Sequence, residues 1–150
     1  MTWTYSQLKA AYNALSPAPA SPAAAATALN AQINATLVDV PVQAVAAYLG
    51  IAGKLAALVA WAASPPSGAA AAAVTAAQEL SLALTHPQAV PAFAMSNSAV
   101  ASAMQSWLAA LVSAGVLTAA DQTAILALAQ TPQWQPAVTG NDVAAAIALP

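Results

Sequence analysis

Charged side chains are almost absent from this sequence. They make up 4% of its 150 residues, whereas about a quarter of the residues of a typical soluble domain are charged. Such side chains normally keep a protein surface dissolved and monomeric. Their scarcity predicts an exterior that meets other protein over much of its area. The charged residues are Lys9, Asp39, Lys54, Glu79, Asp121 and Asp142.

Basic residues are scarce and cysteine is absent, and each of these facts argues against particular classes of function. Binding to nucleic acid needs a cluster of lysine and arginine, and two basic residues in the whole chain argue against that partner. The sequence has no cysteine, which excludes disulfides and cysteine-based metal or redox chemistry and leaves both a cytosolic and a virion location open. The opening residues MTWTYSQLK lack a basic region followed by an apolar stretch, so we expect no cleaved secretory signal.

Long runs of large apolar residues are also missing. The mean hydropathy of +0.69 is high, but alanine supplies most of it. A membrane-spanning helix needs about 20 predominantly apolar residues. Of the two best windows, residues 45–63 contain Lys54 and two glycines, and residues 99–117 contain four serine or glutamine side chains. We therefore expect no membrane span.

Proline and glycine divide the sequence into short alanine-rich blocks that carry helix signals, which predicts an all-α fold. Thr4 and Gln7 have the spacing of a capping box, and the helix that follows should end near Leu15. The proline-rich residues 16–22 then predict an extended linker. We expect an N-terminal helix with a proline-rich arm over residues 1–20 and a single helical domain over residues 21–150.

The domain should be a compact bundle of about six or seven short helices. The clearest helix covers residues 98–114, with one apolar stripe and Gly115 at a position that needs φ > 0. Thr118 should cap the next helix and Asn141 the last. Helices are predicted over residues 23–35, 42–50, 54–63, 69–85, 98–114, from 119 onward and over 142–149, with extended chain at 36–41 and a loop at 88–97.

Large side chains are few, and they fall into two predicted groups. The first should anchor the core: Trp61, Phe93, Trp107, Leu108, Leu111 and Leu126. The second is a set of interface candidates, because aromatic side chains concentrate where protein partners meet. These candidates are Trp3, Tyr5, Phe93 and Trp134, and Phe93 belongs to both groups.

No pattern of residues predicts catalysis, a cofactor or a metal site. His86, the single histidine, precedes Pro87 at a predicted helix end, where an imidazolium interacts favourably with the helix dipole. A catalytic histidine needs a nucleophile and an orienting group nearby, and none is indicated. Asp121 and Asp142 fall in predicted first helical turns, where capping explains them. We therefore predict no enzyme activity, and Glu79 and His86 are the residues whose replacement would test a lytic or depolymerising alternative.

Several segments resemble a family of small alanine-rich helical proteins encoded among the structural genes of tailed bacteriophages. They include residues 109–121 (AALVSAGVLTAAD), 125–129 (ILALA) and 138–146 (VTGNDVAAA), together with 28–30, 40–42 and 48–49. The similarity spans about residues 23–146. This chain lacks the basic residues that the family carries near Trp134 and at the C-terminus. The resemblance implies a structural or accessory protein of the virion and carries over no catalytic residue.

Together these observations predict a non-enzymatic virion protein, present in many copies and bound to other capsid or tail proteins through apolar surface. Decoration of the capsid is the first hypothesis, because low charge and small side chains suit close lateral packing. A tail- or fibre-associated protein and a secreted or cell-surface helical binding module are the alternatives. We expect homo-oligomers or a multi-copy assembly, with no cofactor and no nucleic acid.

Overall fold

The computed structural model describes residues 3–34 and 36–150. Within these ranges the chain forms eight helices and two very short strands, which confirms the predicted all-α class. The helices are α1 (Tyr5–Asn13), α2 (Pro22–Asn30), α3 (Val42–Ile51), α4 (Leu55–Ala63), α5 (Ala71–Thr85), α6 (Ser98–Ser113), α7 (Ala119–Ala127) and α8 (Gly140–Ile147), and the strands are β1 (Val40–Pro41) and β2 (Ala92–Phe93).

The chain divides into two compact units. A terminal unit contains residues 3–34 and 131–150, and a central unit contains residues 36–130. This division differs from the predicted arm over residues 1–20 and domain over residues 21–150. Leu8 of α1 is fully buried in a cluster that includes Val143 of α8, so the first helix belongs to a core that the two ends of the chain build together.

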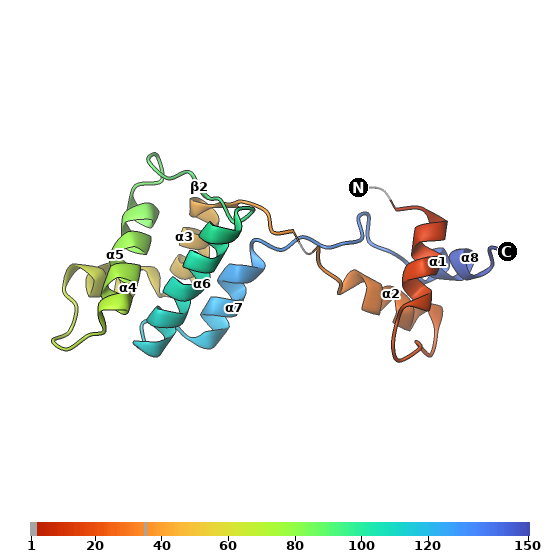
Figure 1. Ribbon diagram of the computed structural model, residues 1–150, viewed down its shortest axis with the longest axis horizontal. Helices are drawn as coiled ribbons and strands as arrows, with labels where there is room; N and C mark the ends of the chain where they lie inside the picture. Colours follow the sequence, from red (N-terminus) through yellow and green to blue (C-terminus); the bar gives the residue numbers. More distant parts are fainter. Residues whose placement is uncertain (1–2, 35) are drawn as a thin grey trace. The chain divides into compact units, whose positions relative to one another are not determined.

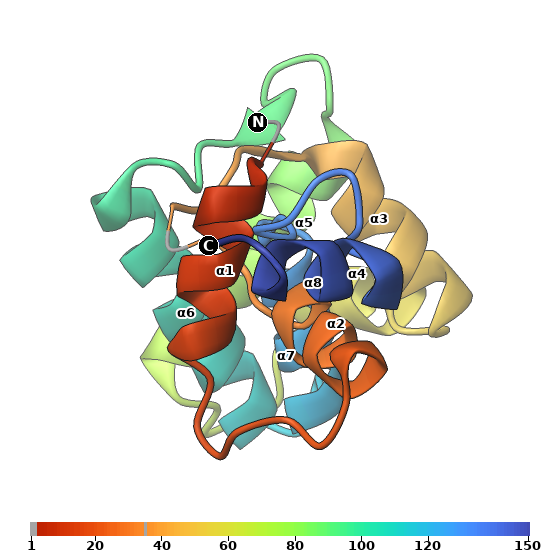
Figure 2. The same cartoon turned by 90° about the vertical axis from the view of Figure 1, so that its right-hand side faces the viewer.

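Three helices make up the terminal unit. α8 packs against both α1 and α2, and the three lie side by side in Figures 1 and 2. Two of these helices, α1 and α8, have a capping box of residues close in sequence at the N-terminus. Thr4 and Gln7 form the predicted capping box of α1. The prediction for α8 was wrong, because Thr139 rather than Asn141 caps it, and Asp142 completes the capping box.

The helix α2 begins as predicted, with Ser21 as its cap and Pro22 in its first turn. It ends at Asn30, earlier than the predicted residue 35, which itself lies outside the described residues. The Asn30 side chain donates to the Val138 carbonyl and accepts from the Val138 amide, both at 2.8 Å. Beyond α2 the chain pairs with residues near Thr131, since the Asn34 amide donates to the Thr131 carbonyl. Contacts with a distant segment therefore replace the last predicted turn.

The central unit places α5 beside α6 and α6 beside α7, while α3 contacts α4, α5 and α7 (Figure 1). β1 and β2 pair antiparallel, with Val40 opposite Phe93. Leu108, Leu111 and Phe93 are buried as predicted. The other three predicted anchors lie at the edge of the core and are only partly buried: Trp61, Trp107 and Leu126.

Buried alanine side chains explain why the indole rings of Trp61 and Trp107 lie at the edge of the core. Ala76 and Ala77 of α5 are fully buried in the core of the central unit. Small side chains on a helix face let the neighbouring helix approach closely, so little room remains in the middle of the bundle for a tryptophan. The core therefore depends on leucine and alanine, with the largest rings around it.

A sharp bend separates α3 from α4. The amide of Lys54 donates to the Leu49 carbonyl at 2.7 Å, and the amide of Gly53 donates to the Gly50 carbonyl at 3.1 Å. Gly53 has φ of +68°, the left-handed conformation that this helix ending requires. No single helix in the described ranges has the length and apolar composition to cross a membrane; α3 and α4 meet those two criteria only as a pair, with 103° between them.

The buried leucines give a direct test of this core. Replacing Leu108, which is fully buried, with alanine should lower the free energy of unfolding by about 2–5 kcal/mol, because a cavity is left. Leu82→Ala is the matched control, since the Leu82 side chain is 57% exposed, and its effect should stay within about 0.5 kcal/mol. Urea denaturation followed by circular dichroism measures both, and equal effects would contradict the packing described here.

Candidate functional site

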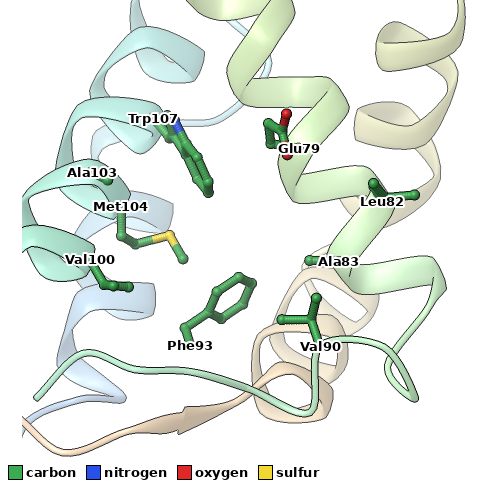
Figure 3. Close-up of a pocket in the computed structure, with 9 residues that line it drawn as sticks. All are labelled: Glu79, Leu82, Ala83, Val90, Phe93, Val100, Ala103, Met104 and Trp107. Carbon is green, nitrogen blue, oxygen red and sulfur yellow. The ribbon is translucent and has the colours of Figure 1, made fainter. Parts of the chain in front are cut away.

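The central unit carries an apolar groove between α5 and α6. Its volume is about 250 Å³, and Figure 3 shows the side chains that surround it. This is small for a drug-sized ligand, which usually occupies about 300–1,000 Å³, and suits a few side chains of a protein partner better. We call this the α5–α6 groove. It is lined by Glu79, Leu82, Ala83, Val90, Phe93, Val100, Ala103, Met104 and Trp107.

The spacing of residues along α5 and α6 determines which side chains form the walls of the groove. Glu79, Leu82 and Ala83 lie at i, i+3 and i+4 on α5, and the four residues of α6 lie at i, i+3, i+4 and i+7 from Val100. Such positions share one face of a helix. Ala83 and Ala103 are small, so space remains between the helices where larger side chains would fill it. The groove therefore follows from alanine within two otherwise regular helical faces.

The floor and the rim of the groove differ in exposure. Ala83, Phe93 and Met104 are buried, and the side chains of Phe93 and Met104 extend into the space between the helices (Figure 3). Leu82 and Val90 are exposed at the edge. Methionine beside an aromatic ring makes an adaptable apolar surface. The floor of the groove is therefore already formed, although its methionine side chain can change conformation. Apolar side chains lie at the rim.

Glu79 is the charged residue among those that line the groove. It is exposed, and no hydrogen bond or ion pair holds it within the described part of the chain. The side chains of four other charged residues form hydrogen bonds inside their own unit, and these are Lys9, Asp39, Asp121 and Asp142. Glu79 therefore differs from those four because its carboxylate lies beside an apolar surface and has no hydrogen-bond partner among the described residues.

Asp121 is the buried charged residue of the central unit. Its carboxylate accepts from the Thr118 amide at 2.8 Å and the Thr118 hydroxyl at 2.7 Å. The Tyr48 hydroxyl donates to the other oxygen at 2.9 Å. These bonds, with the charge of Lys54, outweigh desolvation and lower the pKa of Asp121 below its ordinary value. Asp121 therefore caps α7, as predicted, and also ties α7 to α3.

Two more carboxylates have structural roles. Asp39 accepts from the amide and the hydroxyl of Ser96, at 3.1 and 2.5 Å, which lowers the pKa of Asp39 and holds the loop before α6. Asp142 caps α8 through Thr139, and those hydrogen bonds lower its pKa. Lys9 donates to the main-chain oxygen of Leu149. Each of these charged side chains satisfies a backbone group of its own unit.

His86 lies where the sequence predicts, at the C-terminal cap of α5. Its Nδ1 atom is 3.0 Å from the Thr85 hydroxyl and 3.2 Å from the Leu82 carbonyl oxygen. Among the residues for which the structure gives positions, no three histidine, cysteine, aspartate or glutamate side chains gather as a metal site would require.

Three of the four interface candidates lie together in the terminal unit. The rings of Trp3 and Tyr5 meet edge to face with centroids 5.8 Å apart, and Trp3 and Trp134 line one hollow. Tyr5 is exposed and Trp3 partly buried. Trp134 is buried, and its indole N–H donates to the Gln32 amide oxygen at 2.9 Å.

Two of the interface candidates are buried within their own unit. Trp134 and Phe93 are 6% and 7% exposed, so neither is a free aromatic anchor on the surface. Phe93 reaches the surface only as part of the floor of the α5–α6 groove. The rim residues Leu82 and Val90 were missed. The apolar stripe of α6 is the sequence signal for this face, and of its groove-lining residues only Trp107 is among the predicted core anchors.

Comparisons of the chain with models of protein families, with curated proteins and with solved structures found no match.

The depressed pKa of Asp121 predicts a pH-dependent effect of Asp121→Asn. A carboxyl whose pKa is lower in the folded chain stabilises it fully above the ordinary value of 3.8, and this contribution disappears as the pH falls through the folded-state pKa. At neutral pH the variant should lose about 1 kcal/mol, as on loss of a helix cap. Thermal unfolding should show this difference shrinking below pH 3.8.

Glu79→Gln is the control for that measurement, because Glu79 is exposed. It should leave the melting temperature unchanged at neutral and acidic pH. A deficit of Asp121→Asn that stays constant from neutral to strongly acidic pH would show that the charge of Asp121 does not act as described.

Proposed function

We propose that this chain is a non-enzymatic structural component of a bacteriophage virion, bound to other virion proteins through apolar surface that carries almost no charge. The observation that carries the proposal is the placement of the charged side chains. Four of the six form hydrogen bonds within their own unit, while large apolar side chains face outward. Those that are exposed are Tyr5, Ile33, Val38, Ile51, Leu82, Val90, Leu128, Ile147 and Leu149.

Such a surface is a disadvantage for a free protein. Exposed apolar patches favour association, and few charges oppose it. In a particle where neighbouring subunits cover the patches, the same surface supplies binding free energy from the apolar area it buries. The chemistry of the exterior therefore favours a permanent place in an assembly over a role as a dissolved monomer.

The α5–α6 groove supports the same role. Its floor is preformed by Phe93 and Met104, and its size suits side chains of a protein partner. The resemblance of residues 109–121 and 138–146 to phage structural proteins supports a virion as the assembly. We place the chain on the head surface, where small side chains and low charge allow many copies to pack side by side.

Detection in particles tests the proposal. The chain should be present in many copies in purified phage particles from the strain that encodes it, as measured by quantitative mass spectrometry. Its absence from particles, together with a well-behaved soluble monomer at high concentration, would contradict the proposed role.

The groove can be tested within the same particles. Leu82→Glu places a charge at the exposed rim, where folding should tolerate it and docking should not, because a charge buried in an apolar interface lacks a partner. The variant should keep its helical content and lose incorporation into particles by about tenfold or more. Leu128→Glu, which alters an exposed leucine of the central unit outside the groove, should be incorporated normally. Equal incorporation of both variants would exclude the groove as the docking site.

A further inference from the structure

The terminal unit carries a hollow in which tryptophan rings and side-chain amides occur together. Its volume is about 370 Å³, which lies within the usual range of small-molecule sites, whereas the α5–α6 groove lies below that range. The lining residues that the structure describes all belong to the terminal unit, and we call the site the terminal-unit hollow. Besides two alanines of α1, it is lined by Trp3, Gln7, Asn34, Gln133 and Trp134.

The indole N–H groups of both tryptophans are already paired within the chain. Trp3 donates to the Pro136 carbonyl at 2.7 Å, and Trp134 donates to the Gln32 side chain. The Trp3 ring also meets Tyr5 edge to face. These contacts fix the orientation of the rings, so what they still offer a ligand is apolar surface. Trp3 is partly buried and Trp134 is buried, so most of that surface belongs to Trp3.

The amide groups of Gln7 and Asn34 are held in opposite orientations. The Thr4 backbone N–H can only donate, so Gln7 turns its oxygen toward it, at 2.8 Å, and keeps its own N–H donors for a ligand. The Pro132 carbonyl can only accept, so Asn34 turns its NH₂ group toward it, at 3.2 Å, and keeps its oxygen as an acceptor. The hollow therefore offers one fixed donor group and one fixed acceptor.

The Gln133 side chain adds an amide that can both donate and accept. It is exposed and makes no hydrogen bond within the described part of the chain. Among the described residues that line the hollow, none is charged. Lys9 of α1 donates instead to the main-chain oxygen of Leu149. The polar groups that the lining side chains present are therefore uncharged amides.

These features argue against three classes of ligand. A lipid tail would leave the amides of the hollow without partners, and a phosphate group would find no cation among the lining residues. An extended peptide binds by pairing with a free backbone edge. The backbone amides of Asn34 and Gln133 already donate, to the carbonyls of Thr131 and Gln32, so this edge is closed.

A neutral sugar has the matching chemistry. Its ring presents an apolar C–H face that packs against an aromatic ring, and the hydroxyl groups around that face both donate and accept hydrogen bonds. The hollow has the same arrangement, with the Trp3 ring as the apolar surface and amides of both kinds beside it. Polar groups that are already oriented lose little freedom when a ligand binds.

We propose that the terminal-unit hollow binds a neutral saccharide, with one sugar ring against the Trp3 indole and its hydroxyl groups bound by the side-chain amides. The Gln7 N–H group donates to a hydroxyl oxygen, and the Asn34 oxygen accepts from a hydroxyl group. The site belongs to a different unit from the α5–α6 groove. Binding is a property of the purified chain, so the proposal does not rest on the virion role.

Indole signals in an NMR titration of the full chain test the site. The chain has four tryptophans, and two of them, Trp61 and Trp107, belong to the central unit. The probes are neutral trisaccharides of glucose, mannose, galactose and N-acetylglucosamine, at millimolar concentrations. At least one should shift the indole N–H signals of Trp3 and Trp134 to saturation and leave the other two unmoved. No shift with any probe, or equal shifts of all four signals, would overturn the proposal.

Two variants separate binding from folding. Gln133→Ala removes an exposed side chain and should leave the melting temperature unchanged. Gln7→Asp should also fold normally, because α7 and α8 use the same threonine–aspartate capping box, but it removes the N–H donors from the hollow. Each should weaken saccharide binding by about tenfold. Gln130→Ala, which alters an exposed glutamine outside the hollow, should bind like the wild type.

Wild-type affinity in both hollow variants would overturn the site. Probes of other classes decide the identity of the ligand. Acetylated and amidated trialanine represents a peptide, and vesicles of phosphatidylcholine with phosphatidylglycerol represent a lipid surface. Neither should change the Trp3 and Trp134 signals. A change with either probe that Gln133→Ala abolishes, in a chain that binds none of the trisaccharides, would assign the hollow to that class and overturn the saccharide.

Discussion

Hydrogen bonds from backbone and hydroxyl groups to three carboxylates are the constraint on which the rest of this structure depends. The first amides of a helix have no partner within it, and short helices leave many such groups relative to their length. Asp121 and Asp142 satisfy them at α7 and α8, and Asp39 does so in the loop before α6. These are three of the four acidic residues in the chain. Most of the few acidic residues are thus held at helix ends and loops, and the low charge of the exterior follows from the composition, in which 4% of residues are charged.

Alanine determines what that exterior looks like. Buried alanines such as Ala76 and Ala77 allow close helix packing, which moves large rings to the edge of the core. Where alanine instead lies at the surface between helices, as Ala103 does, it leaves space and a groove results. One residue type therefore makes the core dense and leaves the surface hollowed.

Local signals predicted most helices, and long-range contacts explain the errors. The capping boxes at Thr4 and Thr118 and the turn at Gly115 depend on residues three or four positions apart, so the sequence displays them directly. The end of α2 and the burial of Trp134 depend on partners more than 100 residues away. Contacts between residues so far apart leave no periodic pattern in the sequence. The α5–α6 groove was missed for the same reason, because the apolar spacing of Val100, Met104 and Trp107 is the same whether the face is covered or open.

The central claim is that apolar contacts with protein cover this charge-poor exterior. Sedimentation velocity of the purified chain at low and high sodium chloride, over a wide range of protein concentration, tests it most directly. Apolar association should persist or strengthen as salt rises, because screening weakens charge pairs and leaves apolar burial intact. A chain that remains monomeric at every concentration, or complexes that dissociate when salt is added, would contradict the claim.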